Sequence, residues 1–269
     1  MFYDIETSKG IYSGFGQGWN KTIGMKDEIV PVKIICICWQ WEGIDETFEL
    51  RWDKGDDKKL VKKFIKELNK ADEIVAHNGD GFDLPRIRAR AIIHGLKMDY
   101  DYPAIDTLKL ARKRAGKGFK FESNRLDYIA QILGVGAKIT TNGELWDRIT
   151  YPSFLPGLYP ITKDYYEALD YMVKYCHMDI EVLKKVYEKL QPYVPHKHHA
   201  AVMSGGNKWD CPKCTSGNVK KNGTRVMASG YRKNQLLCKN CKYQWKVPPR
   251  VVLNWEQWKL DVKLYNESI

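Results

Sequence analysis

The sequence predicts a mixed α/β sheet domain over residues 1–192, followed by a small β-rich domain built around a metal site. Three β-rich runs near the start precede helices that alternate with further strand, which is the order of a mixed sheet covered by helices. A long amphipathic helix pattern then ends the first domain. Downstream, two C-x-x-C pairs lie in a segment that alternates turn residues with short β-like runs.

The net charge of +11 on the 269 residues is concentrated in one segment. Residues 200–250 hold 11 Lys and Arg against one acid, whereas residues 1–199 hold 31 basic and 29 acidic side chains. Such a basic segment is typical of a nucleic-acid contact surface. No run approaches the roughly 18 apolar residues that span a membrane. The acidic start does not resemble a secretory signal, so we expect an intracellular, cytoplasmic protein, in the host cytoplasm if it is viral.

The first predicted strand, in FYDIETS, carries two acids on one face. Side chains alternate along a strand, so Asp4 and Glu6 point one way and Tyr3 and Ile5 the other. An edge strand with a solvated face would explain this pair by itself. The runs PVKIICICWQW and ETFELRW predict two more strands.

Helices and a short strand follow. DDKKLVKKFIKELNK has apolar residues at helical spacing, EIVAH is a short strand, and LPRIRARAIIHG has Pro in its first turn and Gly after its last. NRLDYIAQILG predicts another helix. Residues 142–161 contain Pro152, Pro156 and Pro160, and we expect a loop there.

The long helix, from about Asp164 to Leu190, has an acid in its apolar stripe. Its other members are Tyr165, Leu169, Met172, Cys176, Leu183, Val186 and Leu190, and Asp179 takes the missing position. An acid in a packed stripe needs a partner, because burying an unpaired carboxylate is costly. Tyr175 lies one turn earlier on the same face.

Asp83 comes directly before a helix, where an Asp is by default a helix cap. Asp4, Glu6, Asp83 and Asp179 nevertheless invite one explanation. Clustered carboxylates repel by roughly 1 kcal/mol per pair even in water, and Mg²⁺ or Mn²⁺ cancels that repulsion through oxygen ligands. Two such ions about 3.5–4 Å apart form the clamp used for in-line displacement at phosphorus, where one activates a water and the other stabilises the leaving 3′ oxygen.

These motifs resemble the DEDD-type (DnaQ-like) 3′–5′ exonucleases of the ribonuclease H-like superfamily. DIET is similar to that family's first motif. In NGDGFD, Asn78 and the pair Phe82-Asp83 match the second motif, and YCHMD matches the third in its tyrosine form, Y-x-x-x-D. The histidine subgroup would have His where this chain has Lys174, and His177 lies on another side of the helix.

The resemblance covers roughly residues 1–190, including IDTLKLARK and the stretch NRLDYIAQILGV that leads to Lys138. It implies a ribonuclease H-like mixed sheet flanked by helices and a 3′–5′ exonuclease with two Mg²⁺ or Mn²⁺ ions. It assigns the four carboxylates to the metals, Tyr175 to the attacking water, and Thr7, Asn78 and Phe82 to the substrate. Fewer residues precede Asp4 than in that family, so the first strand is short or the protein begins upstream.

The second metal site is formed by cysteines. CPKC (Cys211, Cys214) and CKNC (Cys238, Cys241) are separated by 23 residues, and two such pairs supply four thiolates for one structural, tetrahedral Zn²⁺. The segment resembles the zinc ribbons of nucleic-acid enzymes, including some transposases. We expect a linker over 193–207, with His196, His198 and His199, a four-cysteine zinc ribbon over 208–250, and a tail over 251–269 that forms a helix.

The ribbon is the expected nucleic-acid contact surface. Its candidate contact residues are Lys220, Lys221, Arg225, Arg232 and Lys233. The aromatic residues Trp209, Tyr231, Tyr243 and Trp245 either stack on bases or form the small core of the ribbon. Cys36, Cys38 and Cys176 are expected in the core.

Two alternatives stay open for the function. DNA is favoured as the substrate, but an RNA 3′-trimming exoribonuclease would use the same residues, because the motifs bind phosphate and metal but not the sugar. The other alternative is a non-catalytic nucleic-acid-binding protein on the same fold. The ribbon could also dock a protein partner. No membrane contact is expected.

Overall fold

The computed structural model describes residues 1–13, 24, 26–71, 73–98, 102–112, 119–136, 141–191, 199–226 and 232–267. The chain forms two compact units, unit 1 (Met1–Val194) and unit 2 (Pro195–Ile269). The glycine-rich residues 14–23, Lys138, the segment 192–198 with His196 and His198, and Tyr231 lie outside the described residues. Within the described ranges no helix is both long and apolar enough to cross a bilayer.

Unit 1 contains a five-stranded mixed sheet in the order β5-β4-β1-β6-β7. Its strands are β1 (Phe2–Thr7), β4 (Ile34–Gln40), β5 (Thr47–Arg51), β6 (Ile74–Ala76) and β7 (Ala104–Asp106), and a separate small hairpin consists of β2 (Ile11–Tyr12) and β3 (Glu28–Val30). β1 pairs antiparallel with β4 and parallel with β6. The mixed α/β sheet predicted from the sequence is confirmed.

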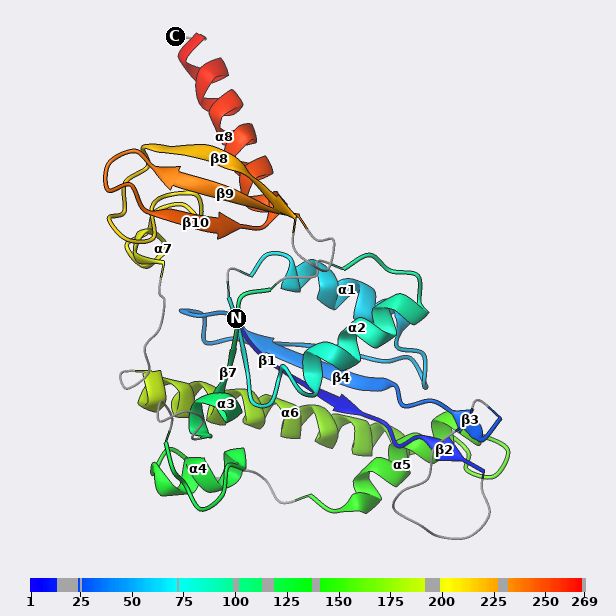
Figure 1. Cartoon of the computed structure of the whole chain (residues 1–269). Helices are drawn as coiled ribbons and strands as arrows, with labels where there is room; N and C mark the ends of the chain where they lie inside the picture. Colours follow the sequence, from blue (N-terminus) through cyan, green and yellow to red (C-terminus); the bar gives the residue numbers. More distant parts are fainter. Residues whose placement is uncertain are drawn as a thin grey trace. The chain divides into compact units, whose positions relative to one another are not determined.

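Helices cover both faces of this sheet (Figure 1). They are α1 (Lys58–Leu68), α2 (Asp83–Ile93), α3 (Thr107–Ala111), α4 (Leu126–Ile132), α5 (Gly143–Phe154) and α6 (Lys163–Leu190). α1 and α2 lie on one side of the sheet, whereas α6 packs on β1 and β4 from the other side and carries α3, α4 and α5 against it. All seven residues of β4 are buried because the strand is covered on both faces.

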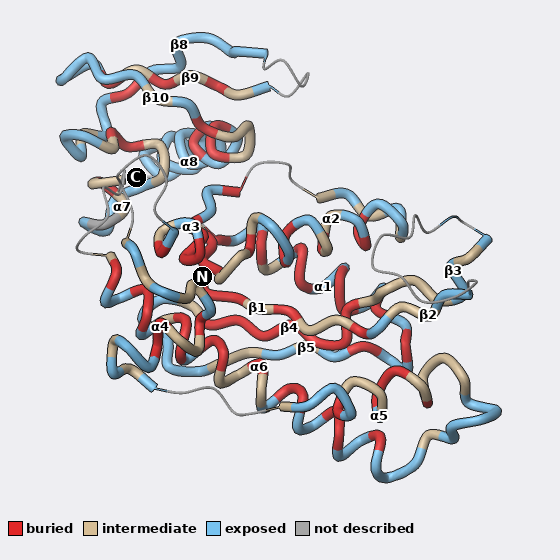
Figure 2. The backbone as a smooth tube through the Cα atoms, turned by 60° about the horizontal axis from the view of Figure 1, so that its bottom comes forward, coloured by how far each residue is buried: buried red, intermediate tan, exposed pale blue. Residues whose placement is uncertain are grey.

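The apolar stripe of α6 lies in the core, as its spacing predicts (Figure 2). Tyr165, Leu169, Met172, Cys176, Leu183, Val186 and Leu190 are all buried, and so is Asp179. Three of these residues, Met172, Cys176 and Val186, have no exposed surface. The helix therefore packs through the stripe in which the acid lies.

The loop expected over residues 142–161 is wrong, because residues 143–154 form α5. Leu145, Ile149 and Pro152 are buried at steps of four and three, which is the spacing of a helix that packs on a core. Pro152 lies in the last turn, so its missing N–H removes a single helical bond. The helix ends at Phe154, one residue before the position that Pro156 restricts.

Unit 2 is a three-stranded antiparallel sheet in the order β10-β9-β8, with two helices. Its elements are α7 (Ala200–Met203), β8 (Val219–Val226), β9 (Arg232–Cys238), β10 (Gln244–Val247) and α8 (Pro249–Glu267). The tail expected to be helical is α8, which begins at Pro249 and packs on β9 through Val251, Val252 and Trp255. This β-rich region with its four cysteines agrees with the predicted fold class.

Candidate metal centres and the adjacent pocket

The strand β1 presents Asp4 and Glu6 on one face, as its alternation predicts. Tyr3 and Ile5 are 1% and 3% exposed, whereas both acids are half-buried. In the antiparallel pair with β4, Asp4 lies opposite Cys38 and Glu6 opposite Cys36. The two carboxylates therefore share the sheet face on which α6 packs.

Asp179 of α6 completes a cluster with these two acids. One carboxylate oxygen from each of Asp4, Glu6 and Asp179 lies within 4.8 Å of the other two. Asp179 itself is 4% exposed, so the cluster is partly sheltered from water. Three negative groups this close repel, and oxygen ligands at this spacing fit a hard divalent cation such as Mg²⁺ or Mn²⁺.

Asp83 contacts the same strand, β1, from the start of helix α2. It is the first residue of α2, and Phe82 is the N-cap residue, without a side-chain capping bond. The default reading of Asp83 as a helix cap is therefore wrong. Its Oδ1 accepts a hydrogen bond from the backbone N–H of Ile5 at 3.2 Å, and the side chain is buried. Asp83 thus contacts β1 between the two acids, but it is not a member of the three-residue cluster.

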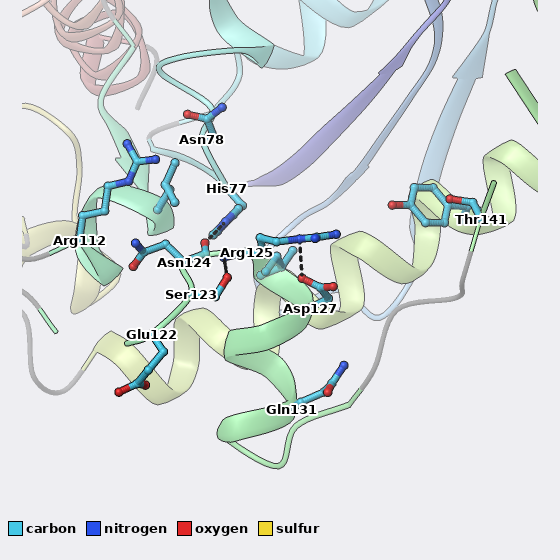
Figure 3. Close-up of a pocket in the computed structure, with 13 residues that line it drawn as sticks. His77, Asn78, Arg112, Glu122, Ser123, Asn124, Arg125, Asp127, Gln131 and Thr141 are labelled. Atoms are coloured by element: carbon cyan, nitrogen blue, oxygen red, sulfur yellow. Dashed lines mark hydrogen bonds and ion pairs between the residues drawn. The ribbon is translucent and has the colours of Figure 1, made fainter. Parts of the chain in front are cut away.

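A polar pocket of about 760 Å³ lies next to Tyr175 of α6, one turn before Asp179 (Figure 3). Two residues named from the sequence, Asn78 and Tyr175, line it. Its other lining residues are His77, Leu108, Arg112, Glu122, Ser123, Asn124, Arg125, Leu126, Asp127, Gln131 and Thr141. The pocket combines amide and guanidinium groups, which are chemically suited to bases and phosphates, with the carboxylates of Glu122 and Asp127, and Arg125 pairs with Asp127 at 3.5 Å.

Hydrogen bonds within unit 1 hold the pocket walls together. The carboxylate of Asp106 accepts from the backbone N–H of Asn78 at 2.9 Å and caps α3 by accepting from Leu108 at 3.0 Å. The ring of His77 contacts Thr107 Oγ1 at 2.9 Å and the carbonyl of Asn124 at 3.0 Å. Asn78 adopts a left-handed φ of 64°, which these contacts help to maintain.

Sequence reasoning missed His77, Asp106 and the two pocket arginines, Arg112 and Arg125. The signal for Asp106 was present, because it directly precedes a helix in IDTLKLARK. The pocket lining from Glu122 to Asp127 was also visible as a polar stretch before α4. Nothing local in the sequence shows that this stretch lies against the end of β6.

The other residues that the sequence motifs singled out in unit 1 lie on β1, at the start of α2 and on α6. Thr7 is half-buried at the end of β1, next to an irregularity in the pairing with β4. Phe82 is 39% exposed before α2. Tyr175 makes an edge-to-face contact with Trp146 of α5, with ring centroids 6.3 Å apart. His177 pairs with Glu49 at 2.9 Å, on another side of α6 from Tyr175.

Three thiols lie in the core beside the carboxylate cluster. Cys36, Cys38 and Cys176 have no exposed surface, which confirms the expectation that they are core residues. Burial raises the pKa of Cys176 well above its ordinary value, and burial likewise raises that of Cys38. The three thiols also contact one another, because Cys176 hydrogen-bonds with Cys36 and Cys38.

The four cysteines of unit 2 converge. Their Sγ atoms all lie within 4.8 Å of one another, with Cys211 to Cys241 at 3.5 Å and Cys214 to Cys238 at 3.6 Å. Zn–S bonds of about 2.3 Å in a tetrahedron require sulfur pairs about 3.8 Å apart, so this donor set fits Zn²⁺. The backbone N–H of Cys241 lowers the pKa of Cys238 to about 6, which favours the thiolate.

The five candidate nucleic-acid contact residues of unit 2 are on its sheet. Lys220, Lys221 and Arg225 are exposed on β8, which is an edge strand, and Arg232 is exposed on β9. Lys233, also on β9, is half-buried.

The aromatic residues of unit 2 divide between its core and its surface. Trp209 and Trp245 pack against the small core, which supports a structural role for them. Tyr243 is 41% exposed and stacks on Trp245 with a ring-centroid distance of 6.3 Å. His199 caps α7 by accepting from the backbone N–H of Val202, so it lies in a helix cap within the expected linker.

Comparison with known proteins identifies a family and two partial likenesses. A family model described as RNase_H superfamily (RNase_H_2) matches residues 1–191. The chain is 37% identical over 65 residues to a DNA polymerase of Methanocaldococcus jannaschii, a match that covers 24% of this chain and 4% of the polymerase. A family B DNA polymerase from the hyperthermophilic archaeon Pyrobaculum calidifontis aligns with a TM-score of 0.48 and 16% identity, over 71% of this chain and 24% of the polymerase chain.

A mixed sheet with three clustered carboxylates beside a polar pocket defines an α/β protein with a candidate divalent-cation centre. The chain belongs to the RNase_H superfamily, whose model matches most of its length. It spans only a small part of the two polymerases. Membership of this superfamily is consistent with a nuclease.

Proposed function

We propose that this protein is a metal-dependent 3′–5′ exonuclease of the tyrosine DEDD type, which shortens nucleic acid from its 3′ end. Its two Mg²⁺ or Mn²⁺ ions are held by Asp4, Glu6, Asp83 and Asp179. A Zn²⁺ ion held by the four cysteines maintains unit 2, whose basic sheet binds the nucleic acid. DNA is the favoured substrate.

One observation carries the proposal: oxygens of Asp4, Glu6 and Asp179 lie within 4.8 Å of one another in a chain of this superfamily. Asp83 adds a fourth carboxylate, buried against Ile5 between two members of the cluster. A surface patch of acids would be solvated and spread apart, but these come from separate elements and converge at a buried helix stripe. Such a convergence is typical of a cation site.

Three groups of residues have separate roles in the proposed hydrolysis: binding the cations, orienting the attacking water and binding the strand. Asp4, Glu6, Asp83 and Asp179 would supply the carboxylate oxygens that bind the cations, and the hydroxyl of Tyr175 would orient the attacking water. Divalent cations, when bound there, supply the charge that activates water and stabilises the leaving 3′ oxygen. Asn78 and the guanidinium groups of Arg112 and Arg125 bind the strand, since they line the pocket that also includes Tyr175.

The preference for DNA rests on the 65-residue match to a protein named DNA polymerase. Unit 2 supports strand binding because Lys220, Lys221 and Arg225 are exposed on an edge strand. Four thiol ligands persist best in a reducing environment, so the proposed location is the cytoplasm.

The test uses 5′-labelled single- and double-stranded DNA and RNA with Mg²⁺ or Mn²⁺. The wild-type chain should shorten DNA one nucleotide at a time from the 3′ end. Asp4→Asn should be inactive, whereas Asp170→Asn, at an exposed acid of α6, should remain active. Immediate release of the 5′ nucleotide, or cutting of a closed circle, would overturn the polarity. Degradation of RNA alone would favour the RNA-trimming alternative, and tight binding without hydrolysis would favour the non-catalytic one.

A further inference from the structure

Cys176 is placed where it contacts a proposed cation ligand. It lies on α6 between Tyr175 and Asp179 and has no exposed surface. Its Sγ is 3.6 Å from Oδ2 of Asp4 and 3.6 Å from the main-chain oxygen of Asp4, which is 172 residues away in the chain. Both distances are within the range of a hydrogen bond donated by a thiol.

We infer that Cys176 is a positioning residue of the carboxylate cluster, whose thiol donates to Asp4 and sets the place of that carboxylate relative to Asp179. The inference rests on the proposed cation-dependent function. It concerns the geometry of the ligands before any cation binds, so direct binding measurements test it.

The cluster needs such a contact because its members come from different elements. Asp4 and Glu6 belong to β1, whereas Asp179 belongs to α6, so the spacing of their oxygens depends on how the helix lies on the strand. Cys176 is three residues before Asp179 in the same buried stripe. Its single thiol hydrogen lies within reach of both the main-chain oxygen and Oδ2 of Asp4, and sharing it between them ties the side-chain direction of Asp4 to the position of the strand.

The position suits a thiol. A small, weakly polar side chain packs in the core as an apolar group does, yet it still offers one donor. A longer polar side chain there would separate α6 from β1. Residues that orient metal ligands commonly affect metal affinity by about 10–100-fold, although they do not bind the ion.

Cys38 provides a matched control. It is as fully buried as Cys176, lies opposite Asp4 on β4 and contacts the Cys176 thiol, but its own Sγ is 3.9 Å from the main-chain oxygen of Val173, so its loss leaves the Cys176 thiol facing Asp4. Replacing either residue by Ala removes one buried sulfur. Replacement of Cys176 also removes a donor to Asp4, so the two variants separate loss of packing from loss of positioning.

The experiment measures Mn²⁺ binding to the full zinc-loaded chain by calorimetry, with the Mn²⁺ dependence of hydrolysis recorded in parallel. Cys176→Ala should weaken Mn²⁺ binding about tenfold, and Cys176→Val, which fills the space without a donor, should do the same. Cys176→Ser keeps a donor and should stay within about threefold of the wild type, and Cys38→Ala should bind as the wild type does.

Two results would overturn the inference. One is equal Mn²⁺ affinity in Cys38→Ala and in the folded Cys176→Ala or Cys176→Val variants, which would reduce Cys176 to a packing residue. The other is a wild-type chain that binds no Mn²⁺ at the carboxylates. A wild-type chain that binds Mn²⁺ but hydrolyses nothing would defeat the proposed function alone, and the comparison of affinities would still decide the role of Cys176.

Discussion

The carboxylate cluster of unit 1 and the cysteine cluster of unit 2 are assembled in different ways. The carboxylates come from the first strand and the last long helix of unit 1, and they meet only because a whole sheet and helix fold between them. The cysteines come in two short pairs, at the turn before β8 and at the turn after β9, and the distances between their sulfurs are close to the edge of a zinc–thiolate tetrahedron. The carboxylate cluster forms because unit 1 folds, whereas a Zn²⁺ ion bound by the cysteine cluster would itself stabilise the fold of unit 2.

The difference in size between the two hydrophobic cores explains why a bound metal would matter more for the stability of unit 2 than for that of unit 1. Unit 1 has an extensive buried cluster that includes all of β4 and the stripe of α6, so its stability does not depend on a bound ion. The described core of unit 2 is small, with Val219, Leu236, Val247, Val251, Val252 and Trp255. Domains with so little apolar burial need a staple such as a metal.

Removing two thiolates should have the largest effect. In the double variant Cys238→Ala/Cys241→Ala, unit 2 should lose its Zn²⁺ and unfold, because Zn²⁺ binding supplies about 10–16 kcal/mol in small zinc modules. Unit 1 should keep its cooperative unfolding transition. Metal analysis and amide hydrogen exchange measure both outcomes, and a protected β9 in the zinc-free variant would contradict the comparison.

Removing one carboxylate should have the opposite pattern, with activity lost and the fold kept. Asp179→Asn should reduce hydrolysis by about 1,000-fold or more, since a missing ligand costs several kcal/mol of transition-state stabilisation. Without metal, unit 1 should be at least as stable as the wild type, because clustered charges repel. The control is Asp170→Asn, an exposed acid of the same helix that pairs with Arg51. A loss of less than tenfold in Asp179→Asn would contradict the prediction.

The next effect concerns the stability of unit 1 alone. Asp57 is fully buried, and its carboxylate accepts from Arg90 Nε at 2.7 Å, Arg90 Nη2 at 2.8 Å and the backbone N–H of Ile34 at 3.0 Å, with His94 Nε2 at 2.7 Å. Asp57→Asn should lower the free energy of unfolding by about 3–5 kcal/mol, because it leaves Arg90 buried with its charge uncompensated. Urea unfolding of unit 1 measures this loss of free energy. The control is Asp164→Asn, which breaks an exposed ion pair.

The pH dependence of this pair follows from the same contacts. Burial alone would raise the pKa of Asp57, but the hydrogen bonds from Arg90, Ile34 and His94 hold it below its ordinary value. A lowered folded-state pKa means that the stabilisation is present above about pH 4 and is lost as the pH falls through the folded value. Wild type and Asp57→Asn should therefore converge in stability under acid. Equal differences at pH 7 and pH 3 would contradict this assignment.

The sequence could predict these two clusters to different extents. The cysteine pairs are local, so their spacing was sufficient to place all four. Asp179 was also visible, because it interrupts an apolar stripe. The bond from Ile5 to Asp83 could not be predicted, since it depends on how α2 approaches β1. The helix α5 was mistaken for a loop because three prolines outweighed the spacing of Leu145, Ile149 and Pro152. Contacts that depend on the packing of distant elements leave no local trace.

The smallest expected effect concerns binding, and it separates the units most directly. A chain ending at Val194 should still hydrolyse a short single strand, because the carboxylates and the core that holds them belong to unit 1. Its affinity for a long strand should fall by about 10–100-fold. If Lys220, Lys221, Arg225, Arg232 and Lys233 each neutralise one phosphate, the slope of log K against log salt should become shallower by about 3.5 for single strands.

The full-length variant Lys220→Gln/Lys221→Gln/Arg225→Gln tests the same charge with unit 2 folded. The slope of its log K against log salt should be shallower than that of the wild type by about 2. It should retain its Zn²⁺, since these side chains are exposed on β8 and none is a zinc ligand. Filter binding across a salt series gives both slopes. If the truncated chain and this variant both bound long strands with the wild-type slope, the basic sheet of unit 2 would not contact nucleic acid. Its exposed edge strand would then be better explained as a surface that docks a protein partner.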